Sequence, residues 1–409
     1  MSESKLHAIV VGSGLAGLAA ASVLRIHHNV TVYERGNPNV ATGGQGMVLF
    51  PNGIKILNSV GFDGSRAGGV PCHGYRMLDN DGKVLEDIPI DFKHRWGADM
   101  LMMKRSDFRD ELMRIATAPA TEPGIEGEPA RLVFNTGVVD LDPEAGTISL
   151  ANGSVVKGDV IIVADGIHST LRKRIVDGED RVAKKTGLTL FRVAVPTKDA
   201  QEAVGTLPEW WDDGQDENRL NIMQLDDPLR VIANYPIRQK TYRNLSCLFP
   251  MHKARQDILE TWYKDGDKEE MLRTFDAFDE KTRKILSIAT EVKVWDLEEL
   301  DSLPNWHRGR ALVIGDAAHA MTPLQGQGAN MAIEDADSLR LLVPGMSGGD
   351  IESILHKIDS IRRPRAAKVL QDTRNQAKSV TLQERLATMD YNCNYNGIHE
   401  ALQKEGLSS

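Results

Sequence analysis

The feature that most constrains this chain is a glycine pattern near its start, Gly12-Ser-Gly14-Leu15-Ala16-Gly17. It follows a β-rich run that begins at His7 and opens an alanine-rich stretch that predicts a helix from Leu15 to Ile26; a second β-rich run begins at Val30. In such a βαβ unit the first glycine makes the turn, the second lets backbone approach a pyrophosphate, and the third lets the helix pack on the strand. We expect a dinucleotide at this helix N-terminus. Its expected contacts are Gly12, Gly14, Leu15, Ala16 and Gly17.

An acidic residue at the end of the second β-rich run supports this prediction. Glu34 stands about 20 residues after the turn, where a carboxylate can accept hydrogen bonds from both hydroxyls of an adenosine ribose. The same charge repels a 2′-phosphate, so NADPH is disfavoured in this site and FAD or NAD remains. Arg35 follows and is expected to lie across the adenine, although a solvated surface arginine explains it equally well.

A second glycine-rich segment favours FAD over NAD. An apolar run from Ala311 ends in Gly315-Asp316, and the chain continues through paired glycines, Gly326 and Gly328, into a helix expected to begin near Asn330. An acid at a strand end can bind the ribityl chain of a flavin, paired glycines let backbone approach its flat ring, and the positive end of a helix stabilises a reduced, anionic flavin. The alternative is a helix with ordinary first-turn acids, here Glu334 and Asp335.

The rest of the chain predicts an α/β fold with two lobes. A third buried strand, Val160 to Ala164, ends in Asp165-Gly166, and we expect it to share one parallel sheet with the other two apolar runs. Alternating β-like runs between 187 and 294 indicate a separate sheet. We expect a Rossmann-type FAD-binding domain formed by 1–75, 100–186 and 295–375, an interleaved β-sheet substrate domain formed by 76–99 and 187–294, and a helical C-terminal segment, 376–409.

The run from Trp306 to Ala336 resembles the group A flavoprotein monooxygenases, the p-hydroxybenzoate and salicylate hydroxylase family. Asp159 to Arg172 resembles the second signature of that family, Lys104 to Arg109 its arginine segment, and Gly43 to Asn52 its loop beside the flavin. The resemblance covers most of the chain. It implies cofactor contacts by Gln45, Gly46, Met47, Arg105, Asp165, Gly166, Gly315, Asp316, Pro323, Gly326, Gly328, Ala329 and Asn330.

The resemblance also implies a reaction. In this family NADPH or NADH reduces non-covalently bound FAD, and a flavin C4a-hydroperoxide then hydroxylates a small aromatic or heteroaromatic, phenolic-type substrate with oxygen from O2. Arg192 and Tyr235 match positions that some relatives use to hold a phenolate, whereas in others the arginine is only structural. An epoxidase or Baeyer–Villiger-type oxygenase on the same scaffold stays open. From other classes, so do an NAD-dependent dehydrogenase and a non-enzymatic nucleotide sensor.

Composition bounds the partners. A net charge of -9 leaves no basic face for nucleic acid. The apolar stretch from Leu6 to Leu24 is interrupted by glycines, so we expect a soluble protein with no membrane segment. Three widely spaced cysteines predict reduced thiols in the cytoplasm, and neither they nor the histidines have metal-ligand spacing, so no metal site is expected. We expect a monomer or a homodimer. The cysteines are Cys72, Cys247 and Cys393.

Overall fold

The three predicted apolar runs form the centre of one sheet. The computed structural model describes residues 4–37, 45–176, 181–211, 217–251, 264–376 and 382–406. Its six-stranded sheet has the order β19-β20-β12-β1-β2-β8, and every neighbouring pair except β19–β20 is parallel. The strands are β1 (His7–Val11), β2 (Asn29–Tyr33), β8 (Arg131–Val133), β12 (Val160–Val163), β19 (His307–Arg308) and β20 (Ala311–Val313). β12 and β20 are buried along their whole length, as expected for parallel strands covered on both faces.

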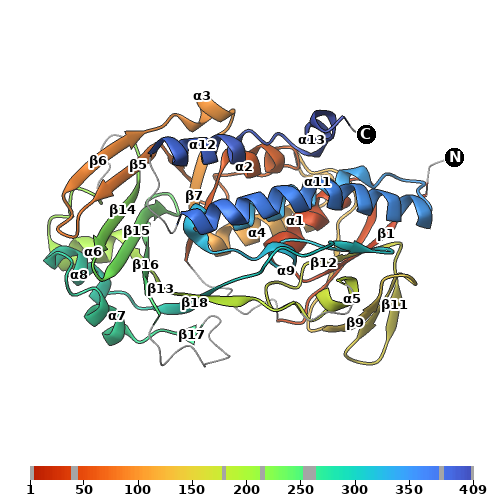
Figure 1. Ribbon diagram of the computed structural model, residues 1–409, viewed down its shortest axis with the longest axis horizontal. Helices are drawn as coiled ribbons and strands as arrows, with labels where there is room; N and C mark the ends of the chain where they lie inside the picture. Colours follow the sequence, from red (N-terminus) through yellow and green to blue (C-terminus); the bar gives the residue numbers. More distant parts are fainter. Residues whose placement is uncertain are drawn as a thin grey trace.

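A second, eight-stranded sheet forms the other end of the molecule (Figure 1). Its order is β17-β18-β13-β16-β15-β14-β5-β6, and it joins two distant stretches of the chain. The strands are β5 (Gly74–Leu78), β6 (Val84–Pro89), β13 (Lys184–Pro196), β14 (Leu220–Asp226), β15 (Leu229–Ile237), β16 (Tyr242–Pro250), β17 (Lys264–Asp265) and β18 (Lys293–Glu299). β13 and β18 cross the expected domain boundaries at 186 and 294, so the two lobes share continuous strands.

Two small sheets complete the strands. β3 (Gly46–Leu49), β7 (Met100–Lys104) and β4 (Val70–Cys72) form one, in the order β3-β7-β4. The other consists of β9 (Val138–Asp142), β10 (Thr147–Leu150) and β11 (Val155–Lys157). Because β7 leads directly into α4 (Arg105–Thr117), the first small sheet connects the predicted flavin loop to the predicted arginine segment.

Helices cover the six-stranded sheet. α1 (Leu15–Leu24) packs against α4 and α10 (Gly328–Ser338), and α10 packs in turn on α2 (Pro51–Asn58). The long α11 (Gly348–Asn375) crosses this layer, and α12 (Leu382–Cys393) lies beside α2 and α3 (Phe92–Trp96) (Figure 1). The remaining helices are α5 (Arg172–Ile175), α6 (Thr197–Val204), α7 (Lys268–Thr274), α8 (Glu280–Ser287), α9 (Asp316–His319), η2 (Pro323–Gln325), η3 (Leu339–Leu341) and α13 (Ile398–Lys404). Among the described helices, none is long and apolar enough to cross a membrane.

Candidate active site

The glycine turn after β1 has the shape that a diphosphate requires. Gly12 has a φ of +100°, and a Cβ added there would lie 2.5 Å from the carbonyl oxygen of Ala164. At Gly17 a Cβ would lie 1.9 Å from the carbonyl oxygen of Gly12, whereas at Gly14 it would meet nothing within 4 Å. Gly14 is also the N-cap of α1 and provides no side-chain cap. Two glycines thus close the turn, and the third leaves the helix N-terminus open to a ligand.

Glu34 stands beside this turn as an ionised carboxylate. Its Oε2 accepts hydrogen bonds from the backbone nitrogen and the hydroxyl of Ser13, at 2.8 and 2.9 Å, and its Oε1 accepts one from Gly36 at 2.7 Å. Burial acts to raise the pKa of Glu34, but these bonds and the charge of Arg35 hold it below its usual value. Leu15 and Ala16 open α1 next to the turn, and Arg35 is exposed beside it.

The Asp165-Gly166 segment lies against the same turn. A Cβ at Gly12 would come within 3.4 Å of the Cα of Asp165, and Gly166 has a φ of +87° with open space around it. Oδ2 of Asp165 accepts a hydrogen bond from the backbone nitrogen of Thr170 at 3.2 Å, while Oδ1 is buried and has no partner among the described residues. Burial raises the pKa of Asp165 despite these bonds. An unsatisfied buried acceptor at this position fits a ligand that donates a hydrogen bond.

The segment after β20 closes on α1 from the other side. Gly315 has a φ of +60°, and a Cβ there would lie 2.6 Å from the Cβ of Ala16. Asp316 follows at the start of α9 with its side chain exposed. The chain thus places the predicted ribityl-binding acid next to the helix that begins at the phosphate turn.

The predicted flavin-ring segment is fixed to the loop around Phe50. Asn330 accepts a hydrogen bond from the backbone nitrogen of Phe50 and donates one to the carbonyl of Gly326, both at 2.9 Å. α10 begins at Gly328, two residues before the expected start, and its N-cap residue provides no side-chain cap. Pro323 is exposed, and Gly328 and Ala329 are half-buried. The N-terminus of α10 is therefore free of a side-chain cap and lies beside the loop around Phe50.

Glu334 and Asp335 are not first-turn acids, so the alternative interpretation of that segment is wrong. Both side chains are fully buried beyond the first turn of α10. Glu334 forms ion pairs with Arg362 and Arg365, each at 2.6 Å, and Asp335 contacts Arg362 at 3.0 Å and His319 at 2.6 Å. Burial acts to raise the pKa of both carboxyls, but the arginines and the hydrogen bond from His319 hold both values below normal. The two acids connect α10 to α9 and α11.

The flavin loop reaches the eight-stranded sheet at Tyr235. The carbonyl of Gln45 accepts a hydrogen bond from the backbone nitrogen of Arg105 at 2.9 Å, and the backbone nitrogen of Gly46 donates one to Oδ1 of Asn244 at 2.8 Å. A Cβ at Gly46 would lie 2.8 Å from Cε2 of Tyr235. Met47, the next residue of β3, is half-buried, and Gly43 and Gly44 lie outside the described residues. Only glycine at position 46 permits this close approach.

Arg192 lies within electrostatic reach of Tyr235 and of Arg105. Burial raises the pKa of Tyr235 to about 12, although Arg192 acts in the opposite direction. Burial lowers the pKa of Arg192; Tyr235 opposes this shift and Arg105 adds to it. The guanidinium of Arg192 lies 4.9 Å from the ring of Trp295, and its Nε is buried without a hydrogen-bond partner among the described residues. Among the residues that the structure describes, no carboxylate forms an ion pair with Arg192.

Two residues of this site escape sequence reasoning. Asn244 faces the flavin loop because β15 and β16 pair Tyr235 with Asn244, and Trp295 faces Arg192 because β18 lies beside β13. Both positions depend on strand register, for which the sequence offers no local signal. Trp210 and Trp211, by contrast, pack around the buried Arg243.

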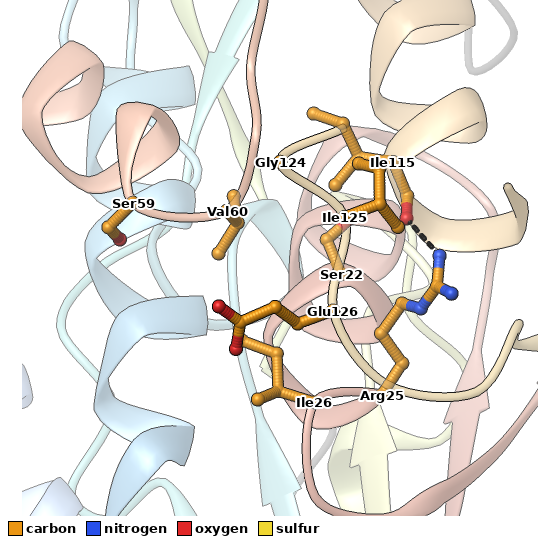
Figure 2. Close-up of a pocket in the computed structure, with 9 residues that line it drawn as sticks. All are labelled: Ser22, Arg25, Ile26, Ser59, Val60, Ile115, Gly124, Ile125 and Glu126. Carbon is orange, nitrogen blue, oxygen red and sulfur yellow. Dashed lines mark hydrogen bonds between the residues drawn. The ribbon is translucent and has the colours of Figure 1, made fainter. Parts of the chain in front are cut away.

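A pocket elsewhere on the molecule involves none of the predicted site residues. It lies where the end of α1 meets the end of α2 and the loop near Gly124 (Figure 2). Beside it, Nη1 of Arg25 donates a hydrogen bond of 2.6 Å to the carbonyl of Ile115. Its lining residues are Ser22, Arg25, Ile26, Ser59, Val60, Ile115, Gly124, Ile125 and Glu126. Within the described residues, no group of three or more histidine, cysteine or acidic side chains is arranged to hold a metal ion.

Comparison with known proteins identifies the family. The model of the FAD binding domain family matches residues 5–373. Hispidin-3-hydroxylase from Neonothopanus nambi is 30% identical over 384 residues, which cover 91% of this chain and 88% of that protein. The chain belongs to the group A flavoprotein monooxygenases. A 6-hydroxynicotinate 3-monooxygenase from Bordetella bronchiseptica is also 30% identical, over 379 residues that cover 90% of each chain.

The fold of this monooxygenase agrees with its family. A salicylate hydroxylase solved as a substrate complex superposes with a TM-score of 0.75 at 22% identity, and the match covers 99% of both chains. Family membership, shown by the family model and by the relatives at 30% identity, makes the protein an FAD-dependent enzyme, and the predictions of a dehydrogenase or a nucleotide sensor are set aside. Members of this family typically use NADH or NADPH as the reductant.

Proposed function

We propose that this monooxygenase uses NADPH or NADH and O2 to hydroxylate a small aromatic or heteroaromatic compound with an acidic hydroxyl or carboxylate. The observation behind this proposal is Arg192, a half-buried cation whose Nε is buried without a hydrogen-bond partner; it lies within electrostatic reach of Tyr235 and Arg105, and no carboxylate is paired to it in the described chain. A buried charge without a counter-charge is costly, and an anionic oxygen of a substrate would remove that cost. The relatives named as hispidin and 6-hydroxynicotinate hydroxylases support a hydroxylated ring as the substrate class.

We assign FAD to the surface that joins the phosphate turn, Asp165, Asp316 and the start of α10. Bound FAD supplies the transfer of electrons from the nicotinamide coenzyme to dioxygen. The proposed contacts are Gly12, Gly14, Leu15, Ala16, Gly17, Glu34, Arg35, Gln45, Gly46, Met47, Arg105, Asp165, Gly166, Gly315, Asp316, Pro323, Gly326, Gly328, Ala329 and Asn330. The predicted domain division, with FAD held by 1–75, 100–186 and 295–375, is part of this proposal.

The side chains of the second sheet act on the substrate. Because burial places the pKa of Tyr235 at about 12, its hydroxyl stays protonated at neutral pH and donates a hydrogen bond to a substrate oxygen. Arg192 stabilises the anionic form of that oxygen, which makes the ring richer in electrons and more reactive toward an electrophilic oxygen donor. The burial of Tyr235 also helps to keep water away from the reacting atoms.

The test compares Arg192→Gln and Tyr235→Phe with wild type, and exposed Arg283→Gln of α8 serves as the matched control. Aromatic acids, phenols and hydroxylated heteroaromatics are screened for stimulated NAD(P)H oxidation and for a product heavier by one oxygen. Arg192→Gln is expected to lower kcat/KM roughly 30-fold or more with FAD content retained, because removing one member of a buried charge pair costs about 2–5 kcal/mol. Unchanged kcat/KM on an anionic substrate contradicts the proposal. The position of the added oxygen separates hydroxylation from epoxidation and Baeyer–Villiger oxidation.

The setting of the enzyme is also part of the proposal. All three cysteines are free and buried, which supports a reducing compartment, the cytoplasm. We propose a monomer or homodimer, and size-exclusion chromatography with light scattering distinguishes the two.

A further inference from the structure

We infer that Arg109, on α4, is a cationic contact for the diphosphate of FAD. Its Nη2 donates a hydrogen bond to the hydroxyl of Ser13 at 3.4 Å, and Ser13 is the middle residue of the turn between Gly12 and Gly14. The inference rests on FAD binding at that turn and is independent of the substrate.

Arg109 lies on the face of α4 that is directed toward the predicted cofactor site. Arg105 and Arg109 are four residues apart, so they lie on one face of α4, one turn from each other. The backbone of Arg105 contacts Gln45 at the flavin loop, while Arg109 reaches Ser13 at the phosphate turn. This face of α4 therefore runs between the places where the flavin ring and the diphosphate of FAD are expected.

Arg109 differs from its neighbour on α4 because it forms no ion pair in the described chain. The next arginine of α4, Arg114, forms ion pairs with Glu111 and with Glu122. Arg109 is half-buried and forms no ion pair with any described carboxylate; its polar contact is the neutral hydroxyl of Ser13. A cation placed beside an open helix N-terminus creates a site for an anion, and a guanidinium can bind two phosphate oxygens at once.

The hydrogen bonds around Ser13 leave Arg109 available to a ligand. The hydroxyl of Ser13 donates to Oε2 of Glu34 at 2.9 Å and accepts from Arg109 at 3.4 Å, which is at the long limit of a hydrogen bond. A diphosphate oxygen can replace the longer bond and leave the shorter one intact. Glu34 then stays fixed for the ribose while Arg109 turns to the phosphates.

The experiment measures binding to the apoprotein, prepared by removing FAD. Wild type, Arg109→Gln, Arg109→Lys and the exposed control Arg283→Gln are titrated with FAD, and binding is followed by the change in flavin fluorescence. Loss of a charge-assisted contact predicts about 10- to 100-fold weaker FAD binding in Arg109→Gln, a smaller loss in Arg109→Lys, and no change in the control. Unchanged affinity in Arg109→Gln overturns the inference.

Two smaller probes identify the part of FAD that is bound. ADP contains the diphosphate and adenosine does not, so competition by ADP is expected to weaken by the same factor as FAD binding, while competition by adenosine stays at its wild-type level. Equal weakening for adenosine places Arg109 at the nucleoside and overturns the inference. Thermal unfolding of each apoprotein checks the fold. If Arg109→Gln does not fold, Arg109→Lys is decisive: its binding of FAD and ADP must weaken while that of adenosine does not.

Discussion

Two arginines in different regions of the molecule, Arg362 and Arg192, have opposite electrostatic environments. Arg362, between α10 and α11, contacts Glu334 at 2.6 Å and Asp335 at 3.0 Å, and despite its burial these acids raise its pKa. Arg192, on the eight-stranded sheet, has no such partner in the described chain, and burial lowers its pKa. An arginine whose charge is neutralised by protein carboxylates, as at Arg362, stabilises the fold. An arginine without such a partner, as at Arg192, indicates a binding site for an anionic ligand.

The largest test of this contrast is Arg362→Leu. Removing the arginine leaves Glu334 and Asp335 buried with too little positive charge, which is expected to lower the free energy of unfolding by about 3–5 kcal/mol. Urea denaturation of the FAD-free proteins measures this value, with Arg283→Leu as the exposed control. A loss below about 1 kcal/mol would show that the cluster does not differ from a surface ion pair.

Acid should weaken the ion pairs around Arg362, because these pairs include two carboxylates. The folded-state pKa values of Glu334 and Asp335 are below those of the unfolded chain, which are about 4.3 and 3.9. Their contribution to stability is therefore fully present above about pH 5 and is lost as the pH falls through the folded values. The free energy of unfolding, measured from pH 6 to pH 2, should fall less steeply in Arg362→Leu than in wild type. Parallel curves contradict this assignment.

A methyl group at Gly46 tests how closely the second region is packed around the flavin loop. In Gly46→Ala the new Cβ would lie 2.6 Å from Cγ of Asn244 and 2.8 Å from Cε2 of Tyr235, so β3 or Tyr235 has to move. We expect a loss of about 1–3 kcal/mol in the free energy of unfolding and weaker substrate binding. Gly14→Ala is the matched control, because its Cβ meets nothing within 4 Å in the protein. Equal stability losses in the two variants contradict the packing described here.

The smallest expected effect on stability is that of Arg192→Met. Methionine fills a similar volume without an unpaired charge, so the free energy of unfolding should change by less than about 1 kcal/mol or increase, although activity is lost. Thermal and urea denaturation of the substrate-free enzyme measure it. A loss comparable to that of Arg362→Leu would mean that the protein itself neutralises Arg192.

The sequence predicts those parts of the molecule whose chemistry is local. The glycine turn, Glu34 and the segment Gly315-Asp316 after β20 depend on neighbouring residues; the structure places Glu34 beside the turn and Gly315 against Ala16 of α1. The partners of Glu334 do not follow from the sequence, because they lie on α11, about 30 residues away, and become neighbours only when α11 packs on α10. Asn244 likewise contacts Gly46 only because of the register of β15 and β16. The cofactor can therefore be predicted from local motifs, whereas the side chains around its site depend on tertiary packing.

Residues 392–395 of the C-terminal segment contact side chains from earlier in the sequence. Arg365 donates to the backbone carbonyl of Asn392 at 3.1 Å and lies 4.5 Å from the ring of Tyr395, while Lys55 donates to the carbonyl of Cys393 at 2.8 Å. A ribosome makes the phosphate turn long before these residues. The layer of contacts around Arg365 can therefore be completed only after the chain up to Tyr395 has been synthesised.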